Sequence, residues 1–117
     1  MIGDRDETVV CETTPDGITV VRVRGDLDED STPALTRVLA AAAGSGSART
    51  VVDLSQVGFA DSSALHALLS ALQAHTATGT ALILAGPVQT AVGRLFEVTN
   101  TGSAFRWADS AHEAMTC

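Results

Sequence analysis

The stretch TVVDLSQVGFADSSAL, residues 50–65, decides the fold, because the spacing of its apolar residues changes from that of a strand to that of a helix. Residues 50–54 form a compact apolar run of the kind that is buried in a sheet, and a polar turn at Ser55-Gln56 precedes a second short strand at residues 57–60. Beyond residue 61 the leucines follow helical spacing: Leu65, Leu68, Leu69 and Leu72. The stretch therefore predicts a buried strand, a short loop and an amphipathic helix that ends at Gly79.

Strands and helices alternate in both directions from this stretch. On its N-terminal side we expect a strand at residues 8–12, a turn at residues 15–17, a strand at residues 18–24 that Gly25 ends, and a helix that starts at Ser31-Thr32-Pro33 and ends at residues 44–47. On its C-terminal side we expect a strand at residues 81–85, a helix over residues 88–96, a strand at residues 105–107 and a last helix capped by Ser110 and Glu113. This order predicts an α/β fold, in which a mixed, mostly parallel sheet with an N-terminal hairpin is covered by about four helices.

The composition is that of one small globular domain spanning residues 1–117. Of the 117 residues, 45% are hydrophobic and 18% are charged, which is enough for a core without a metal or disulfides, and we expect the first seven or so polar residues to be flexible. The chain shows neither a secretory leader nor an apolar run of the ~20 residues that span a bilayer, so we expect a soluble cytoplasmic protein. Cys11 and Cys117 lack paired spacing and are expected to be free thiols.

The charge is strongly acidic. The chain has 14 acidic residues, seven arginines, no lysine and a net charge of −7, which argues against nucleic acid and anionic membranes as ligands. The acidic triplet Asp26, Asp28 and Asp30 does not make an EF-hand, because Ser31 and Arg37 occupy the positions that require glycine and glutamate. This loop either places negative charge at the start of the following helix or complements a basic partner, and both interpretations stay open.

Two hydroxyl groups follow Asp61 on the loop between the central strand and its helix. In a parallel sheet, functional groups gather where strands pass into helices. One interpretation of Asp61-Ser62-Ser63 is a helix cap, since aspartate and serine are favoured there. The other is a phosphoacceptor, because the start of a helix tolerates the charge of about −1.5 to −2 that a phosphoryl group adds.

Three segments resemble the STAS domain family, specifically the bacterial anti-sigma factor antagonists. Residues 50–65 look like the family's signature, Gly25-Asp26-Leu27-Asp28 is similar to its Gly-Glu-Leu-Asp loop, and residues 94–99 are similar to its late helix. The resemblance implies a STAS-like fold and identifies Ser63 as the residue that accepts phosphate. It implies that Asp61 supports this site, that Ser62 flanks it, and that Asp26 and Asp28 lie on a neighbouring loop of the partner-binding surface.

The resemblance also implies a regulatory function rather than catalysis. The unphosphorylated protein would bind an anti-sigma factor, a serine kinase with bound ATP, and so free a sigma factor for transcription. Phosphorylation of Ser63 would reverse this, and a serine phosphatase would reset it. The family usually has glycine where this chain has Ala64, which would add a methyl group near the approaching kinase. The alternative is a STAS scaffold that is never phosphorylated, a subunit of a transporter or of a stressosome-like assembly.

Catalytic and metal-binding interpretations find little support. Ser63 lacks the Gly-x-Ser-x-Gly context of a hydrolase nucleophile. His66, His75 and His112 are too scattered to bind a metal and are expected to be solvated on helix surfaces. A glycine-rich phosphate loop is missing as well, so we expect no enzyme activity, no metal and no cofactor.

Overall fold

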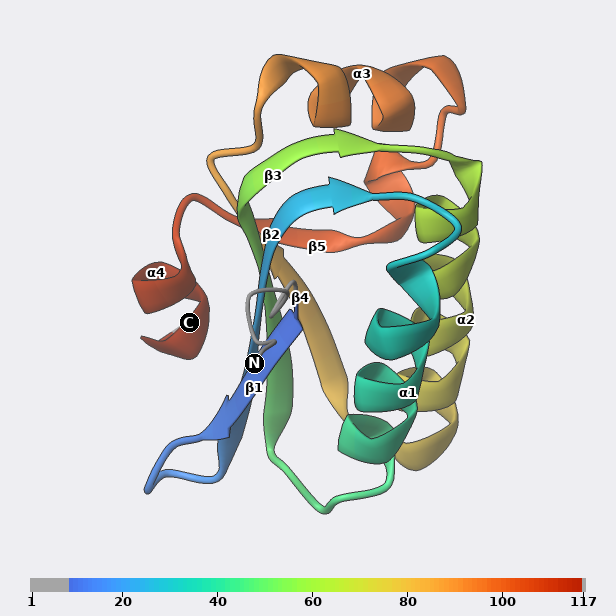
Figure 1. Cartoon of the computed structure of the whole chain (residues 1–117). Coiled ribbons are helices and arrows are strands. Elements are labelled where there is room, and N and C mark those ends of the chain that lie inside the picture. Colours follow the sequence, from blue (N-terminus) through green and yellow to red (C-terminus); the bar gives the residue numbers. More distant parts are fainter. Residues whose placement is uncertain (1–8, 117) are drawn as a thin grey trace, which may run out of the picture.

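The computed structural model describes residues 9–116, which form a five-stranded sheet with helices against it (Figure 1). The elements follow in the order β1 (Val9–Thr13), β2 (Ile18–Leu27), α1 (Thr32–Ala43), β3 (Arg49–Ala60), α2 (Ser62–Thr78), β4 (Ala81–Ala85), α3 (Thr90–Val98), a 3-10 turn (Gly102–Ala104), β5 (Arg106–Ala108) and α4 (Ala111–Thr116). Strand order is β1-β2-β3-β4-β5, with β1 and β2 antiparallel and the other pairs parallel. The predicted α/β architecture with an N-terminal hairpin is confirmed. The expected flexibility of the first seven residues, and Cys117, lie outside the described residues.

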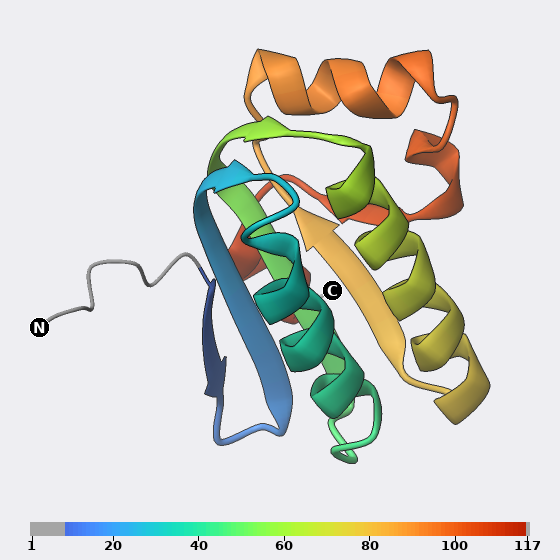
Figure 2. The same ribbon diagram turned by 45° about the vertical axis from the view of Figure 1, so that its right-hand side comes forward.

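The sheet separates two apolar clusters. Helices α1 and α2 lie side by side on one face (Figure 2), where Val21 and Val23 pack with leucines such as Leu35 and Leu68. On the other face Ile18 and Val20 of β2 belong to a smaller cluster with residues of β3, β4 and α4. Burial of a leucine side chain stabilises the fold by roughly 2 kcal/mol, so the larger cluster beneath α1 and α2 contributes most of the stability. No helix within residues 9–116 is both long and apolar enough to cross a membrane.

The central strand β3 is longer than predicted and is bulged. Ser55-Gln56 is not a turn, because β3 continues through it from Arg49 to Ala60. The side chain of Asp53 accepts hydrogen bonds from the Ser55 amide at 3.0 Å and from its hydroxyl at 2.7 Å. Beside this bend the β2–β3 register shifts by one residue, which is the signature of a β-bulge. The polar pair therefore marks an irregularity within one strand.

Strand β2 also runs further than predicted. Gly25 does not end it: with φ of +83° the glycine takes a conformation that other residues rarely adopt, and the strand continues to Leu27. Pairing with β3 resumes beyond the irregularity, up to Leu27 opposite Ala60. Asp26 consequently lies in a strand rather than in a loop.

The prediction of three solvated histidines is wrong for His75. His66 and His112 are exposed, but His75 is 0% exposed beneath α2. Its Nδ1 lies 2.7 Å from the Ala71 carbonyl oxygen, and its Nε2 lies 2.9 Å from Thr50 Oγ1. The helical spacing that buries Leu65 and Leu68 also places His75 on the inner face, and its two hydrogen bonds make that burial tolerable.

The C-terminal segment matches its prediction with small shifts. The last helix is capped as expected: Ser110 Oγ accepts from the Glu113 amide at 3.1 Å, and Glu113 accepts from the Asp109 amide at 2.8 Å. The strand begins one residue later than predicted, because Phe105 is buried edge-to-face against Phe96 with ring centroids 5.8 Å apart. Among the cysteines the structure describes, Cys11 is exposed and free on β1, where desolvation and the adjacent Glu12 carboxylate raise the pKa of its thiol.

Candidate functional site

Two neighbouring parallel strands deliver the starts of α1 and α2 to the same end of the sheet. Leu27 at the end of β2 pairs with Ala60 at the end of β3. The Asp61 amide then donates to the Leu27 carbonyl oxygen at 3.1 Å, which joins the two loops that follow. Both helices begin at this edge (Figure 2). The site is therefore built by the parallel register of β2 and β3.

Asp61 is the N-cap of α2. Its Oδ1 accepts hydrogen bonds from the backbone amides of Ser63 at 2.9 Å and Ala64 at 3.3 Å, and from the Ser63 hydroxyl. These bonds lower the pKa of Asp61, the bond from the Ser63 hydroxyl most of all. The cap is thus made by the aspartate, and the proton of Ser63 points toward a carboxylate.

The two serines differ in their surroundings. Ser62 is exposed, whereas Ser63 is half-buried and lies with its Oγ 3.4 Å from Thr32 Oγ1 of α1. Both line a groove of about 950 Å³ between α1 and α2. The other residues that line this groove are Glu29, Thr32, Pro33, Thr36, Arg37, His66, Ala67 and Ser70. A partner seated on the two helices would meet both hydroxyls at one end of this groove.

Ala64 does not stand where the sequence suggested. It is 0% exposed and packs in the core under α1 and α2. The inference that its methyl group lies near an approaching kinase is therefore wrong. The first turn of α2 presents Ser62 and Ser63 outward and turns Ala64 toward the sheet, because successive helical residues are about 100° apart.

The acidic loop before α1 is internally braced. Asp28 Oδ1 accepts from the backbone amides of Asp30 at 3.0 Å and Ser31 at 3.2 Å. Ser31 stands at the N-cap position of α1 but makes no capping bond; its hydroxyl donates to the Asp26 carbonyl oxygen at 2.9 Å and accepts from the Asp28 amide at 3.0 Å. Asp28 therefore orders the loop, while Asp26, Glu29 and Asp30 are exposed.

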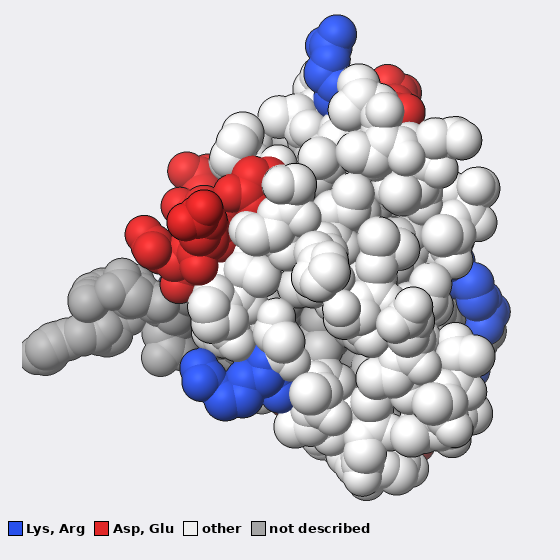
Figure 3. Space-filling model, turned by 90° about the vertical axis from the view of Figure 1, so that its right-hand side faces the viewer, with Lys and Arg blue, Asp and Glu red and all other residues white. Residues whose placement is uncertain are grey.

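Charge is distributed unevenly over this side of the molecule. Figure 3 shows the face formed by α1 and α2: its centre is largely uncharged, acidic side chains gather at one margin, and basic side chains stand beside them and elsewhere along the margin. Phe59, a residue the sequence analysis did not single out, is 48% exposed at the end of β3 and pairs in register with Asp26. A second register shift, opposite Gly25 and Asp26, precedes it. A bulge can re-aim a side chain in this way, but its position was not readable from the sequence.

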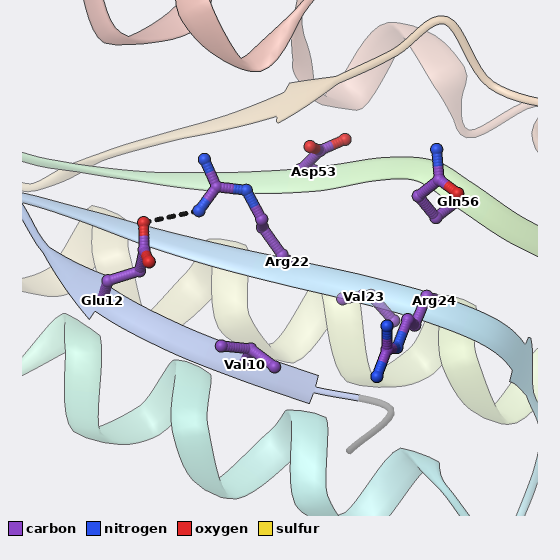
Figure 4. Close-up of a pocket in the computed structure, with 7 residues that line it drawn as sticks. All are labelled: Val10, Glu12, Arg22, Val23, Arg24, Asp53 and Gln56. Carbon is purple, nitrogen blue, oxygen red and sulfur yellow. Dashed lines mark hydrogen bonds and ion pairs between the residues drawn. The ribbon is translucent and has the colours of Figure 1, made fainter. Parts of the chain in front are cut away.

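A second hollow, of about 470 Å³, lies over β1, β2 and β3 (Figure 4). Among the charged groups that line it, Arg22 pairs with Glu12, and Asp53 accepts a hydrogen bond from Ser55. Within residues 9–116, no cluster of three or more His, Cys, Asp or Glu side chains is placed to hold a metal ion. We therefore take the groove beside Ser63 as the candidate functional site.

Comparisons with known proteins agree with this architecture. A family model described as "Mlab, STAS domain" matches residues 12–103. An anti-sigma factor antagonist from Mycobacterium paratuberculosis is 26% identical, with a TM-score of 0.81 and coverage of 93% of this chain and 91% of that one. The anti-sigma factor antagonist SpoIIAA in its unphosphorylated form is 20% identical, with a TM-score of 0.77 and 92% of both chains covered. The Bacillus cell fate determinant SpoIIAA in its phosphorylated form is 19% identical, with a TM-score of 0.71 and 92% and 96% covered. No curated protein sequence matches the chain.

Proposed function

The chain belongs to the STAS domain family, and from that premise we propose that it is an anti-sigma factor antagonist switched by phosphorylation of Ser63. The unphosphorylated protein binds an anti-sigma factor, a serine kinase with bound ATP, and thereby frees a sigma factor. Transfer of the γ-phosphoryl group to Ser63 ends this binding, and a serine phosphatase restores it. In this role the protein is the substrate of the reaction rather than its catalyst, and it needs no cofactor of its own.

The position of the Ser63 hydroxyl carries the proposal. Phosphoryl transfer depends mainly on positioning and electrostatics, because its transition state requires little covalent help from the acceptor. Ser63 is held by the Asp61 carboxylate at the end of the groove, so its oxygen has a fixed place while its proton is already directed to an acceptor. Ser62 is the exposed neighbour and the natural comparison.

Electrostatics explain how phosphorylation would release the partner. The bond from the Ser63 hydroxyl to Asp61 would be lost, and a group of about −1.5 to −2 charge would stand beside that carboxylate. Exposed acids lie close by, Asp26 near the end of β2 and Glu29 and Asp30 on the loop that follows it. A hundredfold loss of affinity requires only about 2.8 kcal/mol, which like-charge repulsion and desolvation at an interface can supply.

The binding surface follows from the same geometry. The face of α1 and α2 has a largely uncharged centre and a margin with an acidic cluster and separate basic side chains (Figure 3), so we expect a partner surface with a neutral centre and with basic groups opposite the acidic cluster. We assign Asp26 and Asp28 to this margin, Asp28 mainly by ordering the loop. Exposed Phe59 adds an aromatic side chain of the kind that anchors interfaces.

Mass spectrometry tests the proposal. The wild-type protein, Ser63→Ala and, as the matched control, Ser62→Ala are incubated with ATP and candidate anti-sigma kinases from the same genome. We expect one added phosphate in the wild type and in Ser62→Ala, and none in Ser63→Ala. Absence of phosphate with every kinase, together with tight binding to a transporter or another assembly, would replace the proposal with the alternative of a constitutive scaffold.

A further inference from the structure

A buried hydroxyl from another helix reaches the proposed phosphoacceptor. Thr32 is the first residue of α1, 7% exposed, and its Oγ1 lies 3.4 Å from Ser63 Oγ. The Thr32 amide donates to the Asp28 carbonyl oxygen at 2.9 Å, so the braced acidic loop holds the threonine in place. Thirty-one residues separate Thr32 from Ser63 in the chain, and the parallel pairing of β2 and β3 brings them together.

The direction of the hydrogen bonds follows from the groups involved. Ser63 has one hydroxyl proton, and the ionised Asp61 carboxylate can only accept, so Ser63 donates to Asp61. The Ser63 oxygen can then only accept from Thr32. The result is a short chain of donors that runs from Thr32 to Ser63 and on to Asp61. Two of the directions around Ser63 Oγ are thereby occupied, and the remaining lone pair is left for the attack on phosphorus.

We propose that Thr32 is a positioning residue that holds Ser63 in its reactive rotamer and so selects it over Ser62 as the phosphoacceptor. This inference rests on the proposed function. In the step concerned, Ser63 Oγ bonds to the γ-phosphorus of ATP, the bond to the β,γ-bridging oxygen breaks, ADP leaves and the hydroxyl proton is released to solvent. Thr32 touches neither ATP nor phosphorus and acts through Ser63 alone.

The chemistry predicts a loss of rate without a loss of affinity. Without the Thr32 hydroxyl, Ser63 keeps its bond to Asp61 but loses the contact on the other side of its oxygen, so other staggered rotamers become more populated and misplace the oxygen. A single net hydrogen bond corresponds to a change of about twofold to tenfold in rate. Thr32→Val keeps the shape of the side chain and removes the donor, whereas Thr32→Ser keeps the donor. Thr76→Val is the matched control, because Thr76 is exposed near the far end of α2, outside the groove, and its hydroxyl donates only to the Leu72 carbonyl oxygen of its own helix.

Two measurements test the proposal. The first is phosphorylation by the kinase that modifies the wild-type protein, with initial rates and with mass-spectrometric mapping of the site. We expect Thr32→Val to lower kcat about twofold to tenfold with KM unchanged and to increase the share of phosphate on Ser62, while Thr32→Ser and Thr76→Val resemble the wild type. The second needs no kinase: three-bond couplings between Hα and Hβ of Ser63 report one rotamer in the wild type and averaging in Thr32→Val.

The possible outcomes distinguish a failure of the role of Thr32 from a failure of the proposed phosphorylation of Ser63. Wild-type rate and site in Thr32→Val, or an unchanged Ser63 rotamer, overturns the role of Thr32 and leaves the phosphoswitch intact. A wild-type protein that no kinase phosphorylates on Ser63 overturns both. A rise in KM with kcat unchanged contradicts positioning, because it would mean that Thr32 contributes to partner binding instead.

Discussion

Removal of the buried pair between His75 and Thr50 should reveal how much the fold depends on one polar contact in its core. The Ala71 carbonyl oxygen can only accept, so His75 Nδ1 carries the proton and Nε2 accepts from the Thr50 hydroxyl. Both residues are 0% exposed. Water cannot replace a lost partner in such a place, and the group left behind bears its full desolvation cost.

The magnitude follows from what each variant leaves unpaired. His75→Leu fills most of the space but leaves the Thr50 hydroxyl without its acceptor, so we expect a loss of about 1 to 3 kcal/mol in the free energy of unfolding. Thr50→Val leaves Nε2 unpaired and should cost a similar amount. The double variant replaces both partners by apolar groups of similar shape and should be less destabilised than the sum of the two, with a coupling of about 1 to 2 kcal/mol.

Urea unfolding followed by circular dichroism measures this cycle. His66→Leu is the control, because His66 is exposed on the same helix and its replacement should change stability by less than about 0.5 kcal/mol. In thermal unfolding the single variants should melt at least about 4 °C lower than the wild type. Strictly additive losses in the double variant would refute the reasoning, since they would mean that the two side chains do not support each other.

Three further predictions concern the surface and the helix cap. The pKa of Asp61 is lowered in the folded protein, so the ionised Asp61 carboxylate stabilises the fold fully above the unfolded pKa of 3.8, and this stabilisation is lost as the pH falls through the lower folded pKa. Asp61→Asn should therefore remove that part of the acid dependence of the free energy of unfolding. Phe59→Ser should weaken binding to the anti-sigma factor at least about tenfold in calorimetry without lowering stability. The control Val98→Ser, at another exposed apolar residue, should leave the affinity unchanged, and equal losses of affinity in the two variants would contradict an anchor at Phe59. Glu12→Gln removes the surface ion pair with Arg22 and should change the free energy of unfolding by less than about 1 kcal/mol. A larger change would show that this pair stabilises the fold more than an exposed ion pair does.

The order of helices and strands was predictable because it depends on the local spacing of apolar residues along the chain. Runs such as residues 81–85 are apolar throughout, and the leucines of α2 repeat at helical spacing, so sheet and helix could be assigned before any contact was known. The end of α2 at Gly79 was equally local, since this residue takes a left-handed φ of +75°.

The wrong predictions concern features that are determined by contacts between residues far apart in the sequence. Ser55-Gln56 has turn-forming residues, but pairing of β3 with β2 absorbs them as a bulge. His75 is polar, yet it is buried because Thr50 lies within reach on the neighbouring strand. The orientation of Ala64 toward the core depends on how α2 sits on the sheet.

The candidate site was predictable in its main residues but not in its geometry. Asp61 and Ser63 stand in one motif, so their proximity was expected, and the hydrogen bond between them follows from their spacing. Thr32 and Phe59 were missed, since the first approaches Ser63 from another helix and the second is exposed only because of a register shift. Both depend on the pairing of β2 with β3.

The most direct test of the account is the affinity of the anti-sigma factor for the two forms of this protein. Isothermal titration calorimetry compares the unphosphorylated chain, the chain carrying one phosphate on Ser63, and Ser63→Ala. We predict that the unphosphorylated chain and Ser63→Ala bind alike, and that the phosphorylated chain binds at least about a hundredfold more weakly, a difference of about 2.8 kcal/mol. Equal affinity of the phosphorylated and unphosphorylated chains would contradict the central claim that charge at Ser63 controls the partner.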